Sequence, residues 1–468
     1  MINTRVLAAC LAAALLITGC ATTAAEAPKV SRPKLDPKSD ANPFPSTYKA
    51  LPSTAIALVG ATIFTGTGDK IDNGTLLLKD GKIEAIGTNV AVPASYTVID
   101  AKDKWITPGI IDAHSHLGVY AQPGGDALSD GNEATGPNTA EVWAEHSIWP
   151  QDEAFNAVRR GGVTSLLILP GSANLFGGRS VTLKNVPATT MQGMKFPGAP
   201  YGLKMACGEN PKRVYGTKNQ PPATRMGNVA GYRKAWLDAS NYAKKWEGYY
   251  TSEGKGEAPD RDLKLDTLAG VLNGEILVQN HCYRADEMAI MIDIAKEFGY
   301  KIAAFHHGSE AYKVADLLAK EGICVATWAG WWGFKIESID GIEANAALIH
   351  TAGGCAVIHS DDAILSQRLN QEAAAALAAG RRLGLNISEG EAIKWITANP
   401  AKMMGIADKT GSLEIGKMAD VVLWSANPLS VYAKTEKVFI DGAVVYDRTD
   451  PKLQPKSDFM VGQPKGGE

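Results

Sequence analysis

Pro108-Gly109-Ile110-Ile111-Asp112-Ala113-His114-Ser115-His116 is the stretch that decides the fold of this chain. A short apolar run follows a Pro-Gly break and ends in two histidines separated by one residue. Because side chains alternate between the two faces of an extended strand, His114 and His116 should project on the same side. Two imidazoles at the end of one strand form half of a divalent-metal site. The stretch therefore predicts a buried strand that delivers metal ligands.

Ligand-type residues also end three later apolar runs of the chain. A single histidine is usually a hydrogen-bonded polar residue and nothing more. Histidines at the ends of several strands, together with an aspartate after the last one, indicate a shared metal site. The residues concerned are His281, His306, His307 and Asp361.

Between residues 109 and 404 the chain alternates between strand-like and helix-like patterns. This alternation is typical of a (β/α)₈ TIM barrel, with a doubly wound open sheet as the competing fold. The scattered ligand residues favour the barrel, because the carboxyl ends of its strands all meet at one mouth. The strand candidates are residues 110–113, 163–169, 180–183, 202–207, 276–278, 301–305, 323–327 and 355–358.

Two β-type segments flank the predicted barrel, at residues 54–108 and 405–448. Each contains a two-residue hairpin signal, Asp80-Gly81 and Asp441-Gly442. Neither segment is large enough to fold alone, so we expect the two to pair into one small β-sandwich domain. Residues 211–262 interrupt the barrel with a polar, aromatic-rich segment. We expect a helical insertion over the mouth that serves substrate gating or dimer contact.

The N-terminus has the features of an export signal. Residues 1–19 combine Arg5, an apolar run too short to span a bilayer, and small residues that lead into Cys20. The pattern resembles a bacterial lipoprotein signal with Cys20 as the lipidated residue; an ordinary secretory signal is the alternative. Ala21 replaces the aspartate of the usual inner-membrane retention signal, so we expect a periplasm-facing protein anchored by lipid to the outer membrane. Residues 20–53 are predicted to be a flexible tether and residues 449–468 a polar tail.

The composition is that of an ordinary soluble globular protein, with 45% hydrophobic and 21% charged residues among 468. A formal net charge of −3 argues against a nucleic-acid partner. Beyond the N-terminal segment, four cysteines lie in or beside apolar runs. We expect buried free thiols there, although an exported protein can form disulfides. They are Cys207, Cys282, Cys324 and Cys355.

The motifs together resemble the amidohydrolase superfamily of metal-dependent hydrolases, within its imidazolonepropionase-related group. The resemblance covers nearly all of residues 54–448. Besides the strand that ends at His116, it is carried by Pro170 to Gly178, Gly208-Glu209-Asn210-Pro211, His281 to Asp286, His307-Gly308-Ser309-Glu310, Ser360-Asp361 and the tail from Gly411 to Asp420.

The resemblance implies a role for each ligand candidate. His114 and His116 would hold the more buried metal, and His281 and His307 a second one. His307 is preferred to His306 because the family pattern is a histidine followed by glycine. Asp361 would contact the metal and take a proton from water. Zinc is expected as one or two ions, with manganese, iron or cobalt as alternatives.

The ligand that would bridge two metals is left between two residues. Superfamily members use either a glutamate or a carboxylated lysine after the fourth strand. Glu209 matches the glutamate type and Lys204 the lysine type. We favour Glu209, because it falls at the end of the predicted strand whereas Lys204 lies nearer the middle.

Three residues are candidates for substrate contact at the predicted mouth. Arg284 would pair with a substrate carboxylate or with an internal acid. Trp328 would stack on substrate or pack against the insertion, and Tyr283 lies beside the His281 ligand. The expected activity is hydrolysis of a C–N bond in a small amide, such as a dipeptide, an N-acyl amino acid or a cyclic amide. A lactone or ester hydrolase and a non-catalytic surface lipoprotein are the alternatives, and homo-oligomerisation is left open.

Overall fold

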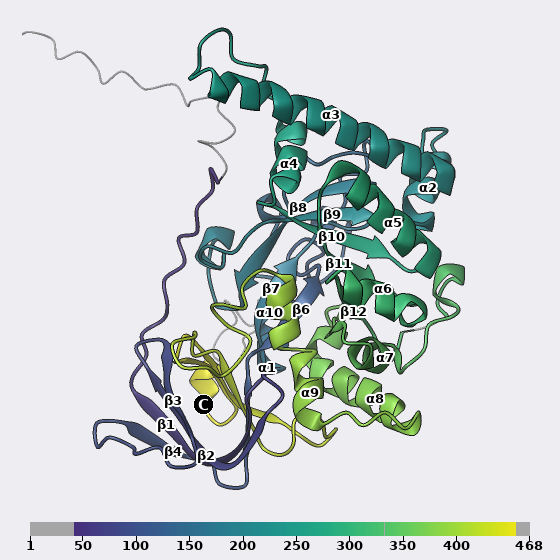
Figure 1. The fold of residues 1–468 in the computed structure, drawn as a ribbon. Helices are drawn as coiled ribbons and strands as arrows, with labels where there is room; N and C mark the ends of the chain where they lie inside the picture. The colour runs from purple at the N-terminus through teal and green to yellow at the C-terminus, as the bar shows by residue number, and fades with distance from the viewer. Residues whose placement is uncertain (1–41, 332, 455–468) are drawn as a thin grey trace, which may run out of the picture. The chain divides into compact units, whose positions relative to one another are not determined.

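The computed structural model describes residues 42–331 and 333–454, and its centre is an eight-stranded sheet that curves into a nearly closed barrel (Figure 1). The strands lie in chain order from β6 to β13. The backbone N–H of Asp361 donates to the carbonyl of His114 at 3.0 Å, which links the chain after β13 back to β6. The predicted barrel is confirmed. Its strands are β6 (Ile110–Ser115), β7 (Val163–Ile168), β8 (Phe176–Lys184), β9 (Gly202–Ala206), β10 (Leu277–Cys282), β11 (Ile302–His307), β12 (Cys324–Thr327) and β13 (Cys355–Ile358).

Strand β8 runs antiparallel to both of its neighbours, which the simple βα alternation does not predict. The connection between β7 and β8 spans only residues 169–175. A parallel crossover needs a dozen or more residues, so this short loop returns the chain in the opposite direction. The remaining neighbours in the barrel pair in parallel, and their carboxyl ends therefore share one edge.

Helices α5 to α8 follow one another around the outside of the barrel (Figure 1). Local signals set their ends: Asp152 caps α1 by accepting from the N–H of Ala154, and α5 stops at Gly299, whose φ is 79°. The helices are α1 (Glu153–Arg160), α2 (Glu209–Gly216), α3 (Arg225–Thr251), α4 (Leu263–Leu272), α5 (Ala285–Phe298), α6 (Ala315–Lys320), α7 (Asn345–Thr351), α8 (Leu369–Arg382), α9 (Glu389–Lys394) and α10 (Ala398–Met403).

The insertion at residues 211–262 is helical, but its long helix α3 packs against the barrel wall instead of covering the mouth. Trp236 is fully buried, and its ring lies 5.3 Å from that of Phe176 on β8 and 4.4 Å from that of Tyr300. The aromatic residues of the insertion therefore serve mainly as the buried face of an outer-layer helix. The start of α3 stays near the mouth, where Asn228 donates to the carbonyl of Gly208.

The flanking β segments join in one hydrogen-bonded sheet. In the order β16-β15-β14-β5-β1-β2-β3, C-terminal β14 pairs antiparallel with N-terminal β5, and β4 pairs with β1. Gly60, with φ 85°, marks a bulge in β1 where the partner changes from β4 to β5. The N- and C-terminal segments thus associate as expected. The strands are β1 (Ile56–Phe64), β2 (Lys70–Lys79), β3 (Lys82–Gly87), β4 (Thr97–Asp100), β5 (Trp105–Pro108), β14 (Val421–Trp424), β15 (Thr435–Ile440) and β16 (Ala443–Asp447).

Part of the predicted flexible tether contacts the folded unit. Phe44 packs edge-on against Trp143, and the hydroxyl of Tyr48 donates to Asp441 at 2.5 Å. These aromatic side chains give residues 42–53 something to bury, so this part is not a free tether. The signal peptide 1–19, Cys20, the tether up to residue 41 and the tail 455–468 lie outside the described residues.

The four cysteines form two disulfides, so the expectation of free thiols is wrong. Cys207 bonds to Cys282 and Cys324 to Cys355, with Cα atoms 5.2 and 4.5 Å apart. Strand register explains both pairs. Ala206 faces His281 across β9 and β10, which brings the next residues together, and Cys324 faces Cys355 across β12 and β13. Among residues 42–331 and 333–454, no helix has both the length and the hydropathy to cross a bilayer.

Candidate metal centre

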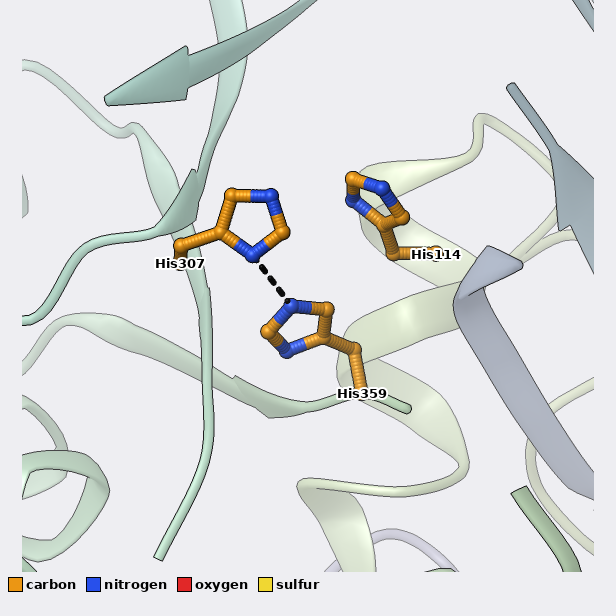
Figure 2. A group of neighbouring side chains, drawn as sticks. All are labelled: His114, His307 and His359. Carbon is orange, nitrogen blue, oxygen red and sulfur yellow. Dashed lines mark hydrogen bonds between the residues drawn. The ribbon is translucent and has the colours of Figure 1, made fainter. Parts of the chain in front are cut away.

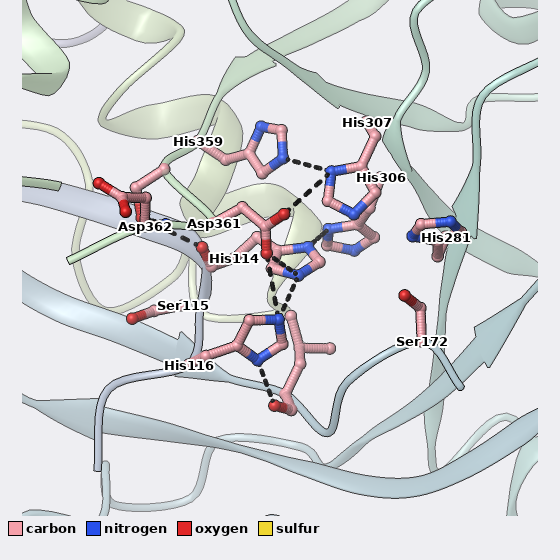
Figure 3. Close-up of polar contacts among 12 residues, drawn as sticks. His114, Ser115, His116, Ser172, His281, His306, His307, His359, Asp361 and Asp362 are labelled. Atoms are coloured by element: carbon pink, nitrogen blue, oxygen red, sulfur yellow. Dashed lines mark hydrogen bonds and ion pairs between the residues drawn. The ribbon is translucent and has the colours of Figure 1, made fainter. Parts of the chain in front are cut away.

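Three ligand-type side chains converge at the carboxyl end of the barrel strands (Figure 3). The Nε2 atoms of His114 and His116 lie 3.3 Å apart, and Oδ1 of Asp361 lies 3.3 and 3.1 Å from them. Two ligands bound tetrahedrally at Zn–N distances of about 2.0–2.1 Å lie about 3.3 Å from each other. The spacing of these three atoms therefore fits a divalent metal.

Lys204 on β9 also reaches this group. Its Nζ lies 3.3 Å from Nε2 of His114, and its side chain is buried. Burial lowers the pKa of Lys204 to about 8. An ammonium beside a metal ligand would repel a cation, whereas a neutral amine can react with carbon dioxide to give a carbamate. The position thus fits the carboxylated-lysine type of bridging ligand.

Glu209, the bridging ligand favoured from the sequence, lies in a different contact. It is the first residue of α2, and its carboxylate pairs with Lys335 at 3.4 Å. Its side chain is 26% exposed. The structure does not bring Glu209 into either group of converging ligand atoms among the described residues. The reason is tertiary: β9 ends at Ala206, and the chain turns away at Gly208, with φ 81°, before Glu209.

Hydrogen bonds at their Nδ1 atoms, on the side of the ring away from Asp361, orient the two histidines of β6. Nδ1 of His116 lies 2.8 Å from the carbonyl oxygen of Leu169, so it carries a proton and leaves Nε2 as the free donor atom. Nδ1 of His114 lies 2.7 Å from Nδ1 of His306, whose Nε2 contacts Oε1 of Gln279 at 2.8 Å. His306 therefore holds the ring of His114 in place and is itself held by Gln279.

A second group of histidines contains one residue that sequence reasoning missed. His114, His307 and His359 converge from three strand ends (Figure 2). Nε2 of His359 lies 3.0 Å from Nδ1 of His307, and its Nδ1 lies 3.0 Å from the carbonyl oxygen of Thr327. The available signal was the H-x-D spacing of His359 and Asp361, the same alternation that pairs His114 with His116.

His281 lies on the opposite side of the group from Asp361 (Figure 3). Its ring centroid is 4.6 Å from that of His307, and the side chain is buried. Nδ1 of His281 is a buried nitrogen without a hydrogen-bond partner among the described residues. A buried polar atom without a partner costs free energy, and a metal ligand removes that cost by binding its ion.

Backbone strain coincides with the site. His307, with φ 74°, and Asp361, with φ 59°, both adopt the left-handed conformation. For residues other than glycine, sparsely populated backbone regions cost about 1–3 kcal/mol and cluster at functional sites. The next residue, Gly308, cannot be enlarged, because a Cβ there would lie 2.6 Å from Val325. The packing therefore leaves no room for a side chain directly after His307.

The surroundings of the site lower the pKa of the histidines and of Asp361. Burial lowers the pKa of His114, His281 and His307 well below the usual value, so each presents a free lone pair. Burial raises the pKa of Asp361, but a proton on the adjacent His307 or His116 outweighs burial and holds the pKa of Asp361 far below its usual range. Neutral imidazoles around an ionised carboxylate form the donor set that zinc prefers.

Asp112, two residues before His114, holds the backbone around the candidate ligands in place. It is fully buried and accepts hydrogen bonds from the hydroxyl of Ser366 at 2.7 Å and from the N–H groups of His114 and Ser360. Burial raises its pKa to about 6 despite these donors. Asp112 therefore ties the end of β6 to the segment that carries Asp361.

The predicted substrate-contact residues have different fates. Trp328 stacks on His307 and His359 with centroids 4.7 and 4.6 Å apart, and Tyr283 stacks on His307 at 5.3 Å. Both are buried walls of the site. Arg284 instead forms an ion pair with Asp286 at 2.9 Å and is 41% exposed. The sequence left Arg284 to pair either with a substrate carboxylate or with an acid of the protein, and in the structure it pairs with an acid of the protein.

An open cavity of about 420 Å³ adjoins the first ligand group. Its lining includes His116 and Asp361 together with Tyr120, Ile364 and Gln367. This volume is at the small end of ligand pockets, which span roughly 300–1,000 Å³. The site thus combines a charged ligand cluster with room for a small substrate.

Comparisons with known proteins agree with this geometry. The model of the amidohydrolase family matches residues 105–445. The chain is 31% identical over 82% of its length to amidohydrolase tasK of Hapsidospora irregularis, of which it spans only 41%. It is 25% identical to the imidazolonepropionase of Brucella anthropi, over 76% of this chain and 87% of that one.

A solved structure extends the likeness to three dimensions. The amidohydrolase from Thermotoga maritima MSB8 superposes with a TM-score of 0.77 at 36% identity, over 84% of this chain and all of that one. The family match, the barrel and the converging ligand residues agree, and the chain belongs to the amidohydrolase family of hydrolases.

Proposed function

We propose that this protein is a metal-dependent hydrolase that cleaves a C–N bond in a small amide substrate. The observation that carries the proposal is the mutual spacing of 3.1–3.3 Å among His114, His116 and Asp361 beside an open cavity. Amides resist water because it is a poor nucleophile and the amine is a poor leaving group. A bound divalent metal would lower the pKa of water and polarise the substrate carbonyl.

The histidines and Asp361 could hold up to two metal ions. We assign His114, His116 and Asp361 to one ion, and His281 and His307 to a second. Lys204, once carboxylated, would supply a further oxygen ligand next to His114. Zinc suits these borderline nitrogen and hard oxygen donors best, and manganese, iron or cobalt would also bind. Histidine orientation comes from the Leu169 carbonyl and His306.

Asp361 carries the proton transfers in this scheme. Its low pKa keeps the carboxylate ionised. The side chain is 23% exposed and lines the cavity. It can accept a proton from the attacking water and later deliver that proton to the leaving nitrogen. Proton transfer by a positioned group contributes about 10²–10⁴ in rate.

The experiment is metal analysis of the purified protein, followed by a hydrolysis screen. Dipeptides, N-acyl amino acids and cyclic amides would be compared with lactones and carboxylic esters. We expect one or two metal ions for each chain and turnover of at least one amide class that stops on chelation. Stoichiometric metal with turnover of esters alone would show that the bond assignment is wrong.

The assignment of Lys204 yields a prediction that separates it from Glu209. Lys204→Ala should lower the metal content, because it removes the only candidate bridge in contact with His114 among the described residues. Glu209→Gln should retain the metal, because the carboxylate faces Lys335. Metal content after equilibrium dialysis measures both variants. Loss of metal in Glu209→Gln but not in Lys204→Ala would reverse the assignment.

We further propose that the protein is exported and anchored through lipidated Cys20. Two disulfides within the folded unit support export, because such bonds persist in oxidising compartments. Fractionation of cells tests the anchor: the Cys20→Ala variant should move from the membrane to the soluble fraction. A wild-type protein already in the soluble fraction would refute it.

Peptide mapping without reductant tests the disulfides themselves. Proteolysis of the purified protein should give one linked peptide pair that contains Cys207 and Cys282 and another that contains Cys324 and Cys355. Both pairs should separate on reduction. If the protein is unfolded without reductant and any of these four cysteines is then alkylated, the prediction is wrong.

A further inference from the structure

The loop after β12 brings a lysine to the edge of the metal centre. Nζ of Lys335 lies 3.2 Å from Oδ1 of Asn210, 3.4 Å from Oε1 of Glu209 and 4.2 Å from the centre of the Tyr283 ring. The side chain is 18% exposed. An ammonium has three N–H donors, and these two oxygens account for two of them. Lys335 therefore has one N–H left to donate to a ligand, in addition to its ion pair with Glu209.

Lys335 is one side chain away from a candidate metal ligand. Nδ2 of Asn210, whose Oδ1 faces Lys335, lies 3.5 Å from Nε2 of His281. Tyr283, whose ring the ammonium contacts, packs edge-on against His281 at 4.8 Å. A group bound at Lys335 would thus be separated from the candidate ligand His281 by a single side chain, Asn210 or Tyr283.

The same loop carries an aromatic surface that leads outward from the metal centre. Trp331 stacks on Trp328 at 5.4 Å, and Phe334 lies 6.0 Å from both rings. Trp328 is buried against His307, whereas Trp331 is 38% and Phe334 52% exposed. Exposed aromatic rings beside a buried one provide a contact surface for an apolar substrate group.

An ion-pair network with two buried carboxylates fixes the loop in place. Two residues beyond Lys335, Glu337 is 3% exposed and pairs with Arg225 at the start of α3. The same arginine pairs with Glu287 on α5 at 3.1 Å. A recognition group held by such contacts loses little conformational freedom on binding. Arg284 lacks this setting, because it pairs with Asp286 on the exposed side of α5.

We propose that Lys335 binds a free carboxylate of the substrate while Trp331 and Phe334 contact an apolar side chain. The substrate class is then an N-acyl amino acid or dipeptide with an apolar residue on the carboxylate side of the scissile bond. This inference rests on the proposed C–N hydrolysis. It assigns binding of the substrate carboxylate to Lys335, whereas the sequence suggested Arg284 for this role.

Matched substrates test the carboxylate contact. Alanyl-phenylalanine and N-acetyl-phenylalanine would be compared with alanyl-phenethylamine and N-acetyl-phenethylamine, which keep the same scissile bond but lack the carboxylate. A hydrogen bond to a charged group contributes a factor of about 10–100, so we expect kcat/KM to favour the acids by that amount. Lys335→Met should abolish the preference by raising KM for the acids, and Lys335→Arg should retain part of it.

Lys313→Met is the control, because Lys313 is 36% exposed and pairs with Asp340 away from the metal ligands. It should keep the wild-type preference. If Lys335→Met keeps the preference, or loses activity equally on acids and phenethylamines, the carboxylate proposal is wrong. Hydrolysis of both substrate types at equal rates by the wild type would also refute it, while the proposed C–N hydrolysis would stand.

A binding measurement separates this proposal from the reaction type. 3-Phenylpropanoate should quench the tryptophan fluorescence of the metal-loaded protein, and 3-phenylpropanol should bind about 10–100-fold more weakly. Lys335→Met should remove that difference. Turnover of esters alone, with this binding pattern intact, would refute the C–N assignment only. Equal binding of the acid and the alcohol by the wild type would overturn the role of Lys335.

Discussion

Replacing Asp361 by asparagine is expected to lower kcat by about 10²–10⁴, the usual contribution of a positioned proton-transfer group. Asparagine keeps the size of the side chain and tolerates the left-handed backbone, with φ 59°, that this position requires. The carboxamide cannot accept the proton of the attacking water. The loss should therefore appear in kcat for the best amide substrate while the circular dichroism spectrum stays unchanged.

The neighbouring aspartate provides a matched control. Asp362 also lines the cavity, but its Oδ1 accepts from the N–H groups of Ile364 and Leu365, and asparagine retains that acceptor. Asp362→Asn should therefore keep the wild-type fold and lose far less kcat than Asp361→Asn, because Asp362 has no assigned proton-transfer role. Metal analysis of both variants separates a lost ligand from a lost base. Activity of Asp361→Asn within tenfold of the wild type at equal metal content would contradict the assigned role.

Replacing Lys184 by methionine is expected to destabilise the protein by about 3–5 kcal/mol, the cost of removing one partner from a buried ion pair. Nζ of Lys184 lies 3.1 Å from Asp420 and 2.7 Å from Asp441, and the lysine and Asp420 side chains are fully buried. Asp420 precedes β14, and Asp441 lies in the turn between β15 and β16. The substitution would thus leave two buried carboxylates unpaired where the barrel meets the flanking sheet.

Urea unfolding followed by tryptophan fluorescence measures this effect. Lys234→Met is the control, because Lys234 is 77% exposed and its pair with Asp238 at 2.9 Å is an ordinary surface contact. Exposed pairs contribute about 0–1 kcal/mol, so the control should unfold close to the wild-type midpoint. A similar midpoint for Lys184→Met and Lys234→Met would show that the buried network does not stabilise the junction.

Local pattern predicted the barrel because each buried strand is a short apolar run with recognisable ends. The predicted run 355–358 is the strand β13, and the run 163–169 differs from β7 by one residue. The direction of β8 was not predictable in this way. It depends on the short loop 169–175, and a strand pattern reads the same in both directions.

Some candidate ligands could likewise be placed from the local sequence pattern, whereas the positions of others depend on tertiary contacts. His114 and His116 face one way because alternation along a strand is a local property. The choice between Lys204 and Glu209 depends on where β9 ends and how the chain turns at Gly208, which contacts with other elements set. His359 was missed although its spacing to Asp361 was visible, because nothing local shows that it meets His307 from another strand.

By itself, the sequence determined the barrel class, the family resemblance and the strand ends that carry histidines, since these follow from residue periodicity and short motifs. Only the tertiary structure decided which cysteines pair, which lysine reaches His114 and which cation is joined to His281 through Asn210. Those outcomes depend on strand register and on loops packed against distant helices. Contacts between residues far apart in the chain arise only when the whole core is buried, and no local pattern encodes them.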